Sequence, residues 1–556
     1  MPFTFVQRRY RHLRRYRQVA EVLLRHGFGY VLDRLELDHL VPFGRRVLPP
    51  AAPQQTRGAR LRAALGALGP TFIKLGQLLS TRPDLVPEDV VAELSLLQDH
   101  APGVPVEQIV PVVERELGRS LQEAFASFED EPLAAASIGQ VHRATLRDGT
   151  LVVVKVRRPG IEEVVETDLE ILQGLAAMVD ERWPQERFSV RAFVDEFARV
   201  LRREMDYRLE AGNIERFRRA WAGDPRVRIP RVFWELTTSR VLVMEYLTGV
   251  KVDDPEGLRR IGVDPRTVAR LGAEVFLRMV LLDGVFHGDP HPGNLFVMED
   301  GVLGIVDFGM VGRLDEDMMN AVADLFVGVI RRDLDRVVRG LVRVGAVDED
   351  ADQRPLRRDL ADLIDRHYGK SLRQMELGPI VQEVLQLAHR HRLRLPEDLT
   401  LLAKALITIE GVGKHLDPEF NALEIAEPFA KELLRRQLDP GYMARRALDD
   451  AAEYLQLLAR VPAKVDQSLT RLLRGEVAIQ FVHKGLEPTV RRLERISNRV
   501  AMSVVLAALI LGSAVVMQSS AGPMIWGVPA LGLLGFVMAA FLGLGLVIGI
   551  LRSGRF

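Results

Sequence analysis

The longest apolar stretches of the chain lie near its C-terminus. From Val500 to Met517 every residue is apolar or small, and from Ala530 to Leu551 the sequence is apolar again. A short segment from Gln518 to Pro523 follows the first stretch. A helix needs about 20 residues to cross the roughly 30 Å hydrocarbon core of a membrane. The pattern therefore predicts a transmembrane helical hairpin over residues 500–556.

Basic residues on both sides of this hairpin predict its orientation. Arginines precede the first stretch and follow the second, and the turn between the stretches has no charge. Basic residues at the ends of spanning helices stay preferentially in the cytoplasm. Both ends of the hairpin, and the body of the chain before it, are thus predicted to face the cytoplasm. The arginines are Arg491, Arg492, Arg495, Arg499, Arg552 and Arg555.

The rest of the chain combines a short β-rich part with a longer helical part, which predicts an α+β fold. The β-rich part runs from Leu133 to Val156 and has a hairpin signal at Asp148-Gly149. Before it, Pro70 is expected to open a new helix, because proline is favoured in the first helical turn. Further helices are predicted over 190–221, 265–438 and 442–499, with an interruption near 286–308, and two further strands over 232–246.

The overall charge is balanced, with 75 basic and 75 acidic residues among 556. Such a chain has no bulk positive charge to attract a nucleic acid, so no nucleic-acid partner is expected. The absence of cysteine excludes disulfides, thiolate nucleophiles and Cys-type metal sites. Only the N-terminus is strongly basic, from Arg8 to Arg17. Two interpretations stay open for it: a helix on anionic lipid, or a solvated arm.

The candidate chemistry follows a definite order along the chain. A small-residue loop, Ala134-Ala135-Ala136-Ser137, precedes a strand whose apolar run contains Lys155. A lysine buried in such a run needs an anionic partner. The order continues with the helix acids Glu204, Asp206 and Glu210, the strand end Met244-Glu245-Tyr246, a polar loop with Asp289 and Asn294, and Asp307-Phe308-Gly309.

This is the order of the protein-kinase motifs. Phosphoryl transfer depends on positioning and charge neutralisation more than on covalent chemistry. Lys155 is expected to hold the α- and β-phosphates of ATP and to pair with a helix glutamate. Asp289 is expected to orient an attacking hydroxyl or water. Asn294 and Asp307 supply the oxygen ligands that Mg²⁺ prefers.

The strand end Met244-Glu245-Tyr246 resembles the hinge that holds an adenine. A rival interpretation of the polar loop takes His287, Asp289 and His291 as metal ligands. Pro290, Pro292 and Gly293 disfavour a helix here, so these residues do not have the spacing of metal ligands on one helix face. The kinase interpretation also explains Asp289 without a zinc ion.

Three features depart from ordinary protein kinases. The phosphate loop is rich in alanine, whereas glycine would let backbone N–H groups approach a phosphate. His291 stands two residues after Asp289, where protein Ser/Thr kinases carry lysine. Lys74 and Gln77 precede the whole kinase-like region, and their spacing places them on one helix face.

Together these features resemble the UbiB/AarF family of atypical kinases, which includes the coenzyme Q-associated mitochondrial members. The resemblance extends over nearly everything from Leu61 to Arg552. The family's motifs fall on Lys74 to Gln77 (Lys-x-Gly-Gln), Ala134 to Ser137 (the Ala-rich loop), Glu204 and Asp206 (Glu-x-Asp), Glu210 (the partner of the strand lysine), Asp289 and Asn294 (the catalytic loop) and Asp307 (magnesium).

The resemblance implies a kinase-like fold with an N-terminal extension over the active site. Lys74 and Gln77 would occupy the space that a protein substrate otherwise takes, tied to Glu204 and Asp206. It also implies an ATP- and Mg²⁺-dependent activity in isoprenoid quinone biosynthesis at a bacterial inner membrane. The expected partners are a membrane lipid or an isoprenoid quinone intermediate and quinone-biosynthesis enzymes. Apart from the resemblance, the spacing Gly545-x3-Gly549 is expected to pack helices together, either within the hairpin or between the two chains of a homodimer.

Two other functions stay open. The loop from His287 to Asn294 also resembles that of small-molecule phosphotransferases of the aminoglycoside and choline kinase type. A non-catalytic scaffold that senses nucleotide and presents lipid is the second. The predicted domains are a basic N-terminal arm (1–60), a helical extension (61–120), a kinase-like N-lobe (121–247), a helical C-lobe (248–440), amphipathic helices (441–499) and the hairpin (500–556).

Overall fold

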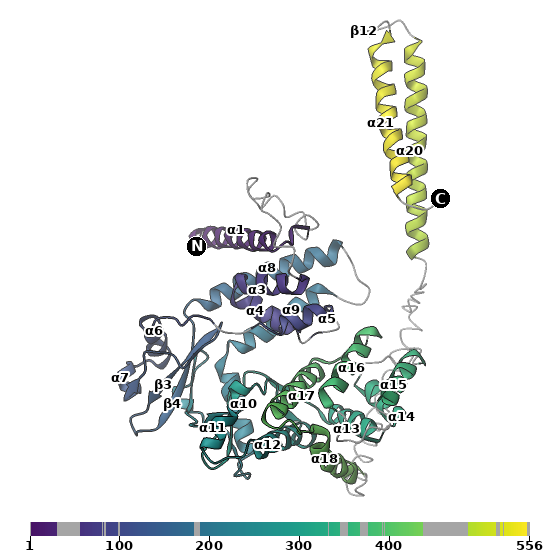
Figure 1. Ribbon diagram of the computed structural model, residues 1–556. Coiled ribbons are helices and arrows are strands. Elements are labelled where there is room, and N and C mark those ends of the chain that lie inside the picture. The colour runs from purple at the N-terminus through teal and green to yellow at the C-terminus, as the bar shows by residue number, and fades with distance from the viewer. Residues whose placement is uncertain are drawn as a thin grey trace, which may run out of the picture. The chain divides into compact units, whose positions relative to one another are not determined.

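A computed structural model divides the chain into two compact units, Met1–Ala444 and Arg445–Phe556. Mixed helix and sheet make up the first unit, in agreement with the predicted α+β class (Figure 1). The structure describes residues 2–30, 56–80, 82, 85–97, 101–182, 189–331, 333–344, 354–366, 376–391, 393, 395–437, 487–518, 523–525 and 528–552.

An antiparallel sheet forms the first lobe of unit 1. Its order is β1-β3-β4-β6, and β2 also pairs with β3. The predicted turn at Asp148-Gly149 is confirmed: Leu146 N donates to Thr150 O over 2.9 Å, and Gly149 has a φ of 86°. Helices α6 (Val106–Leu117) and α7 (Leu121–Ala124) pack against this sheet. The strands are β1 (Ser127–Phe128), β2 (Ala134–Ala135), β3 (Gly139–Thr145), β4 (Leu151–Arg157) and β6 (Val241–Glu245).

A helical body with its own hydrophobic core makes up the extension. Phe72, Leu94, Leu169 and Phe197 are buried in this core. The predicted break at Pro70 is confirmed, since one helix ends at Leu68 and the next begins at Pro70. The helices are α1 (Pro2–Arg25), α3 (Arg57–Leu68), α4 (Pro70–Ser80), α5 (Glu88–Leu94), α8 (Ile161–Arg182) and α9 (Val190–Glu204). The extension core therefore includes α8 and α9, which come after the first four strands in the chain.

The basic N-terminal region is helical from Pro2 to Arg25 and is part of the extension. Val19 and Val22 lie in its core. Arg15 donates to the fully buried Asp168 over 2.6 Å and also to the carbonyl of Leu68. Over residues 12–25, where side chains are described, a solvated arm is thus the wrong interpretation.

The long helix predicted over residues 190–221 is wrong at its centre. The structure has α9 and then α10 (Tyr207–Ala220), because Asp206 accepts a hydrogen bond from Arg208 N and caps a new helix. Of the two strands predicted over 232–246, the second is β6, and the first is reduced to one antiparallel bridge of Val232 with Met244, followed by a 3-10 turn, η3 (Trp234–Leu236).

The second lobe of unit 1 is mainly helical. Its core contains Phe276, Phe286, Leu402 and Phe420, contributed by helices, by the strand before the polar loop and by the connection between α17 and α18. The helices are α11 (Pro255–Arg260), α12 (Pro265–Arg278), η4 (Met279–Asp283), η5 (Pro292–Asn294), α13 (Glu316–Arg331), α14 (Leu334–Arg343), α15 (Arg354–Arg366), α16 (Leu377–Arg390), α17 (Glu397–Leu416) and α18 (Ala422–Gln437).

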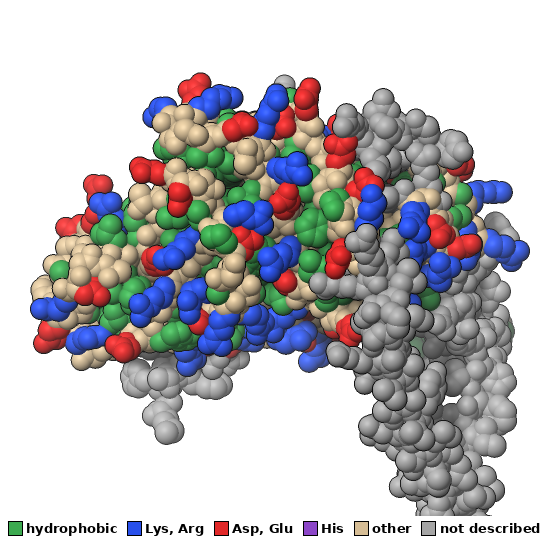
Figure 2. All heavy atoms as spheres, turned by 90° about the horizontal axis from the view of Figure 1, so that it is seen from below, with side chains coloured by type: hydrophobic (Ala, Val, Ile, Leu, Met, Phe, Trp, Pro, Cys, Tyr) green, Lys and Arg blue, Asp and Glu red, His purple; other side chains and the backbone are tan. Residues whose placement is uncertain are grey.

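Two small sheets frame the polar loop of this lobe. The first has the order β5-β10-β9-β7, and the second pairs β11 with β8. On the face of the molecule shown in Figure 2, basic and acidic side chains both occur among apolar and neutral ones. The strands are β5 (Val227–Arg228), β7 (Val250–Lys251), β8 (Val285–His287), β9 (Leu295–Val297), β10 (Leu303–Ile305) and β11 (Val311–Arg313).

The described part of unit 2 is a helical hairpin. Helices α20 (Glu487–Met517) and α21 (Ala530–Arg552) lie side by side, joined by the strand pair β12 (Met524–Ile525) and β13 (Val528–Pro529) (Figure 1). Within the described residues, one helical segment is long and apolar enough to cross a membrane, Val500–Met517, with a mean hydropathy of 2.5.

Several predictions for the C-terminal part stay untested. The pairing of two helices is present, but their position in a membrane remains a prediction. Most of the predicted amphipathic region, residues 438–486, lies outside the described residues, and the packing around Gly545 and Gly549 is not described.

Candidate active site

Three charged side chains from separate elements meet between the lobes. Lys155 lies on β4, Glu210 in the first turn of α10, and Asp307 after β10. The Lys155 ammonium lies 2.9 Å from both carboxylate oxygens of Glu210 and 3.7 Å from Asp307 Oδ1. The side chain of Glu210 is 6% exposed, whereas that of Asp307 is 49% exposed. One cation thus faces a buried and an accessible carboxylate.

The electrostatics of this group favour its charged form. Burial alone would lower the pKa of Lys155, but the carboxylates of Asp307 and Glu210 outweigh burial and hold that pKa well above its usual range. The Lys155 ammonium lowers the pKa of Asp307. Burial raises the pKa of Glu210, and the ammonium counteracts this effect. Asp307 is therefore an anion that is available for a cation.

Asp307 has a backbone conformation that is unusual for its type. Its φ is 59°, the only positive φ of a non-glycine among the residues described. The next residue, Phe308, is fully buried, with its ring centroid 4.8 Å from Phe217 and 5.2 Å from His287. Asn213 Nδ2 also donates to Phe308 O over 3.1 Å. The packing of Phe308 therefore fixes the direction of the Asp307 carboxylate.

His287 connects the polar loop to the segment before Asp307. Burial lowers the pKa of His287, which keeps its ring neutral. Its Nε2 lies 3.1 Å from Val306 O and donates to it, so Nδ1 accepts from Asp289 N over 3.2 Å. Both ring nitrogens are thus occupied, which argues against a metal site formed with Asp289 and His291. Among the described residues, no group of three or more His, Asp or Glu side chains could hold a metal ion.

Hydrogen bonds within the polar loop fix the positions of Asn294 and His291. Asn294 Nδ2 donates to Asp289 O over 3.1 Å, which leaves the amide oxygen free to accept or to bind a cation. His291 Nδ1 accepts from Gly293 N over 3.2 Å and caps the turn η5. The histidine at the position of the usual kinase lysine is therefore engaged within its own loop.

Asn294 and Asp307 have the chemistry of a magnesium site. Both present hard oxygen atoms, and Val306 N donates to Asn294 O, which ties the backbones of the two segments together. Two protein ligands are few, but Mg²⁺ usually binds one or two carboxylates together with substrate phosphates. These residues therefore fit a magnesium ion bound with a nucleotide.

A side chain that the sequence did not indicate completes the site. Lys404, on α17, lies 3.1 Å from Asp289 Oδ1, and each side chain is 38% exposed. Neither motif nor spacing could have revealed it, because α17 follows the polar loop only after several intervening helices. A lysine alone on a helix is ordinarily a solvated residue.

The alanine-rich segment is a strand and not a free loop. Ala134 and Ala135 form β2 and pair with Val141 and Gln140 of β3. Ala136 N donates to Gly139 O over 2.8 Å and closes a tight turn. Ser137, within that turn, is buried.

The neighbour of Ser137 anchors this turn. Ile138 lies in the hydrophobic core of the extension, together with Phe72, Leu75 and Leu201. The tip of the β2–β3 turn is therefore inserted into the extension, an arrangement that alanine content alone does not predict.

The hinge residues end the first sheet. Met244 is buried in the main core, and the Glu245 carboxylate accepts from Arg231 N over 3.0 Å and pairs with Arg228. Tyr246 N donates to Leu151 O over 3.1 Å. The segment is thus tied to β4 on one side and to Arg228 and Arg231 on the other, where it leaves the first lobe.

The motif residues of the extension behave differently from one another. Lys74 forms an ion pair with Glu204, as expected. Gln77 Nε2 donates to Leu97 O over 3.2 Å within the extension. Asp206 caps α10 and pairs with Arg208 over 2.7 Å. The expected tie of Lys74 to Glu204 is therefore confirmed, and its tie to Asp206 stays a prediction.

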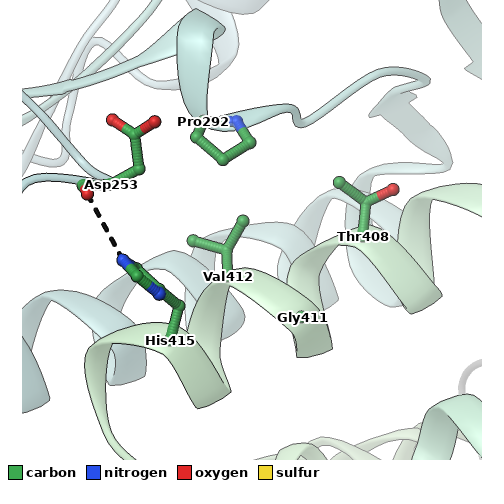
Figure 3. A pocket seen from close by; sticks show the side chains of 6 residues that line it. All are labelled: Asp253, Pro292, Thr408, Gly411, Val412 and His415. Atoms are coloured by element: carbon green, nitrogen blue, oxygen red, sulfur yellow. Dashed lines mark hydrogen bonds between the residues drawn. The ribbon is translucent and has the colours of Figure 1, made fainter. Parts of the chain in front are cut away.

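A cavity of about 440 Å³ lies between the polar loop and α17. Figure 3 shows Pro292 and Asp253 on one side and a face of α17 on the other. His415 Nε2 lies 3.3 Å from Asp253 O and bridges the two sides. The other lining residues are Thr408, Gly411 and Val412.

Comparisons with known proteins agree with this architecture. Residues 96–341 match the ABC1 atypical kinase-like domain, residues 360–421 the UbiB helical domain, and residues 484–552 the ABC1/UbiB kinase-like C-terminal domain. Helix α17, which carries Lys404, thus falls within the second of these regions.

Individual relatives extend over most of the chain. A protein of Marinobacter nauticus named "Probable protein kinase UbiB" is 34% identical over 425 residues, which are 76% of this chain and 78% of the relative. An uncharacterized protein of Clostridium pasteurianum is 30% identical over 540 residues, 97% of this chain and 99% of its own. "Protein ACTIVITY OF BC1 COMPLEX KINASE 1, chloroplastic" of Arabidopsis thaliana is 36% identical over 420 residues, 75% of this chain and 61% of its own.

Proposed function

Because the chain belongs to the ABC1/UbiB family of atypical kinase-like proteins, we propose that it is a membrane-anchored, Mg²⁺- and ATP-dependent atypical kinase or ATPase that supports isoprenoid quinone biosynthesis. The observation that carries the proposal is the meeting of Lys155, Glu210 and Asp307 beside the loop of Asp289 and Asn294. These five side chains follow the order of the kinase motifs along the sequence. They have the charges and oxygen ligands that phosphoryl transfer requires.

Each residue has a role that its contacts support. Lys155, held by Glu210, is placed to bind the α- and β-phosphates of ATP. Asn294 and Asp307 would hold Mg²⁺, which would neutralise phosphate charge when bound. Asp289 has a carboxylate oxygen in reach of solvent, so it can orient the attacking hydroxyl or water and take its proton.

The membrane part of the proposal rests on the surface of the hairpin. Large apolar side chains of both helices are exposed, among them Leu511 (67%), Val515 (70%), Leu531 (76%) and Phe541 (73%). Water-soluble proteins seldom expose such a continuous apolar surface. A lipid bilayer would cover it, with unit 1 in the cytoplasm, and would bring unit 1 close to a lipid or quinone intermediate.

The cavity beside the polar loop supports a second candidate, a phosphotransferase with a small-molecule acceptor. Its volume lies in the range of small-ligand sites, and Pro292 on its wall is three residues from Asp289. Under this proposal the acceptor would occupy the cavity. The ion pair of Lys74 with Glu204 has no role in this second proposal.

Quinone profiling of a deletion strain tests the first proposal. The strain is complemented with the wild-type chain, with Asp307→Asn, and with Arg226→Gln as a control for a surface ion pair away from the site. Wild type and the control should restore the quinone, and Asp307→Asn should accumulate an intermediate. Full restoration by Asp307→Asn would refute a role for the nucleotide site in quinone formation.

A further inference from the structure

The polar loop has no lysine at the position where the catalytic loop of protein Ser/Thr kinases carries one. The position two residues after Asp289 carries His291, and the His291 side chain caps the turn η5. Among the described residues, the cation that contacts the Asp289 carboxylate is Lys404, at 3.1 Å. The positive charge next to Asp289 therefore comes from α17 and not from the polar loop.

Helix α17 is fixed at several points against this region. Near its start, Arg313 N donates to Asp398 Oδ1 over 3.0 Å. One turn further, Leu401 packs so closely on Gly288 that a Cβ there would lie 2.7 Å from Leu401 Cδ2. At its far end, His415 contacts Asp253 O. Lys404 thus projects from a rigid support next to Asp289.

We propose that Lys404 is the γ-phosphate cation of this site, a role that rests on the proposed ATP dependence. An ammonium has three N–H donors. Asp289 Oδ1 accepts one, and a side chain that is 38% exposed has room for a phosphate oxygen beside it. Lys155 lies with Glu210 and Asp307. Lys155 would therefore bind the α- and β-phosphates, and Lys404 would bind the γ-phosphate. Lys404 then counters the charge of the γ-phosphoryl group and keeps it next to Asp289.

The chemistry of the transfer places this charge where it is needed. The bond between the γ-phosphorus and the β–γ bridging oxygen breaks, and a bond forms from the phosphorus to the oxygen of the acceptor hydroxyl or water. The acceptor proton passes to the Asp289 carboxylate, and ADP leaves with the bridging electron pair. A cation at the γ-oxygens stabilises the charge spread over them during this step.

A structural ion pair is the alternative explanation. Exposed pairs usually contribute about 0–1 kcal/mol to stability, so the pair itself explains little of the fold. Lys414 offers a matched control: it lies on the same helix, is 35% exposed and pairs with Glu376 over 2.7 Å. Its removal deletes the same charge and one ion pair, away from Asp289.

The test compares ATP with ADP binding in the full-length protein. Thermal-shift titrations with Mg²⁺-ATP and Mg²⁺-ADP are made for wild type, Lys404→Ala, Lys404→Arg and Lys414→Ala. Loss of one charge-assisted contact should weaken ATP binding by Lys404→Ala about 10- to 100-fold and leave ADP binding unchanged. Lys404→Arg should keep part of the ATP preference, and Lys414→Ala should keep all of it.

Each result decides between the proposals. An unchanged ratio of ATP to ADP affinity in Lys404→Ala overturns the role of Lys404, and so does an equal loss for both nucleotides. If Lys414→Ala loses the preference for ATP over ADP as much as Lys404→Ala does, the cause is a general charge effect. This result also overturns the role of Lys404. If wild type binds neither nucleotide, the proposed ATP dependence fails first, and the role of Lys404 fails with it.

Discussion

The ion pair of Lys155 with Glu210 allows a prediction whose size depends on pH. Lys155→Met removes the cation and leaves Glu210, 6% exposed, without its partner and near a second carboxylate, Asp307. Breaking a buried pair by removing one member typically costs about 3–5 kcal/mol, because a charge remains buried. The variant can avoid part of this cost, since Glu210 can take up a proton.

The free energy of protonating Glu210 limits the stability deficit of Lys155→Met. Starting from the ordinary glutamate pKa of 4.5, neutralising Glu210 at pH 7 costs about 3.4 kcal/mol, and this cost falls by about 1.4 kcal/mol for each pH unit. A folded pKa above the unfolded one gives stability at low pH that is lost as pH rises. The stability deficit of Lys155→Met should therefore be about 3 kcal/mol at pH 7 and below about 1 kcal/mol at pH 5.

Urea unfolding followed by tryptophan fluorescence measures this effect. The set is wild type, Lys155→Met, Glu210→Gln and the double variant, each at pH 5 and pH 7. The double variant has no charge left at this buried pair and should recover most of the loss, with a coupling energy of about 2 kcal/mol. A deficit of Lys155→Met that is the same at both pH values, or a double variant as unstable as the sum of the singles, would refute the reasoning.

Three further outcomes follow from the site and the hairpin. Asp307→Asn should lose the extra stabilisation that Mg²⁺ gives to bound ATP, since an amide replaces a carboxylate ligand; equal thermal shifts would contradict the metal assignment. Burial lowers the pKa of His287, so wild type should lose stability as pH falls below 6.5, and His287→Gln should lose less over the same range in thermal melts. A chain that ends at Arg499 should leave the membrane fraction and still bind nucleotide, because Lys155 and Asp307 lie in unit 1; retention after a high-salt wash would identify another anchor.

The sequence predicted those parts of the site that local order defines. Lys155, Glu210, Asp289 and Asp307 could be found because each motif has a fixed place in the kinase order. The Asp148-Gly149 turn and the helix start at Pro70 were also predictable, since both depend on the backbone preferences of one or two residues.

Other features depend on contacts between distant segments, which a sequence pattern does not contain. Lys404 is part of the site only because Leu401 and Gly288 bring α17 to the loop. Asp206 caps a second helix, α10, although the periodicity of residues 190–221 is that of a single long helix. The alanine-rich segment became a strand through its pairing with β3, which composition alone does not indicate.

The burial of Ile138 in the extension has a consequence for rates. The turn that it anchors would have to move for a nucleotide to enter or leave beneath it, and this movement takes an isoleucine out of a hydrophobic core. Burial of such a side chain contributes about 1.5–3 kcal/mol, which corresponds to a slowing of roughly 10- to 150-fold. Nucleotide exchange should then be governed by the lifetime of a closed turn and not by diffusion. If the site binds ATP as proposed, the extension would then limit the rate of nucleotide exchange.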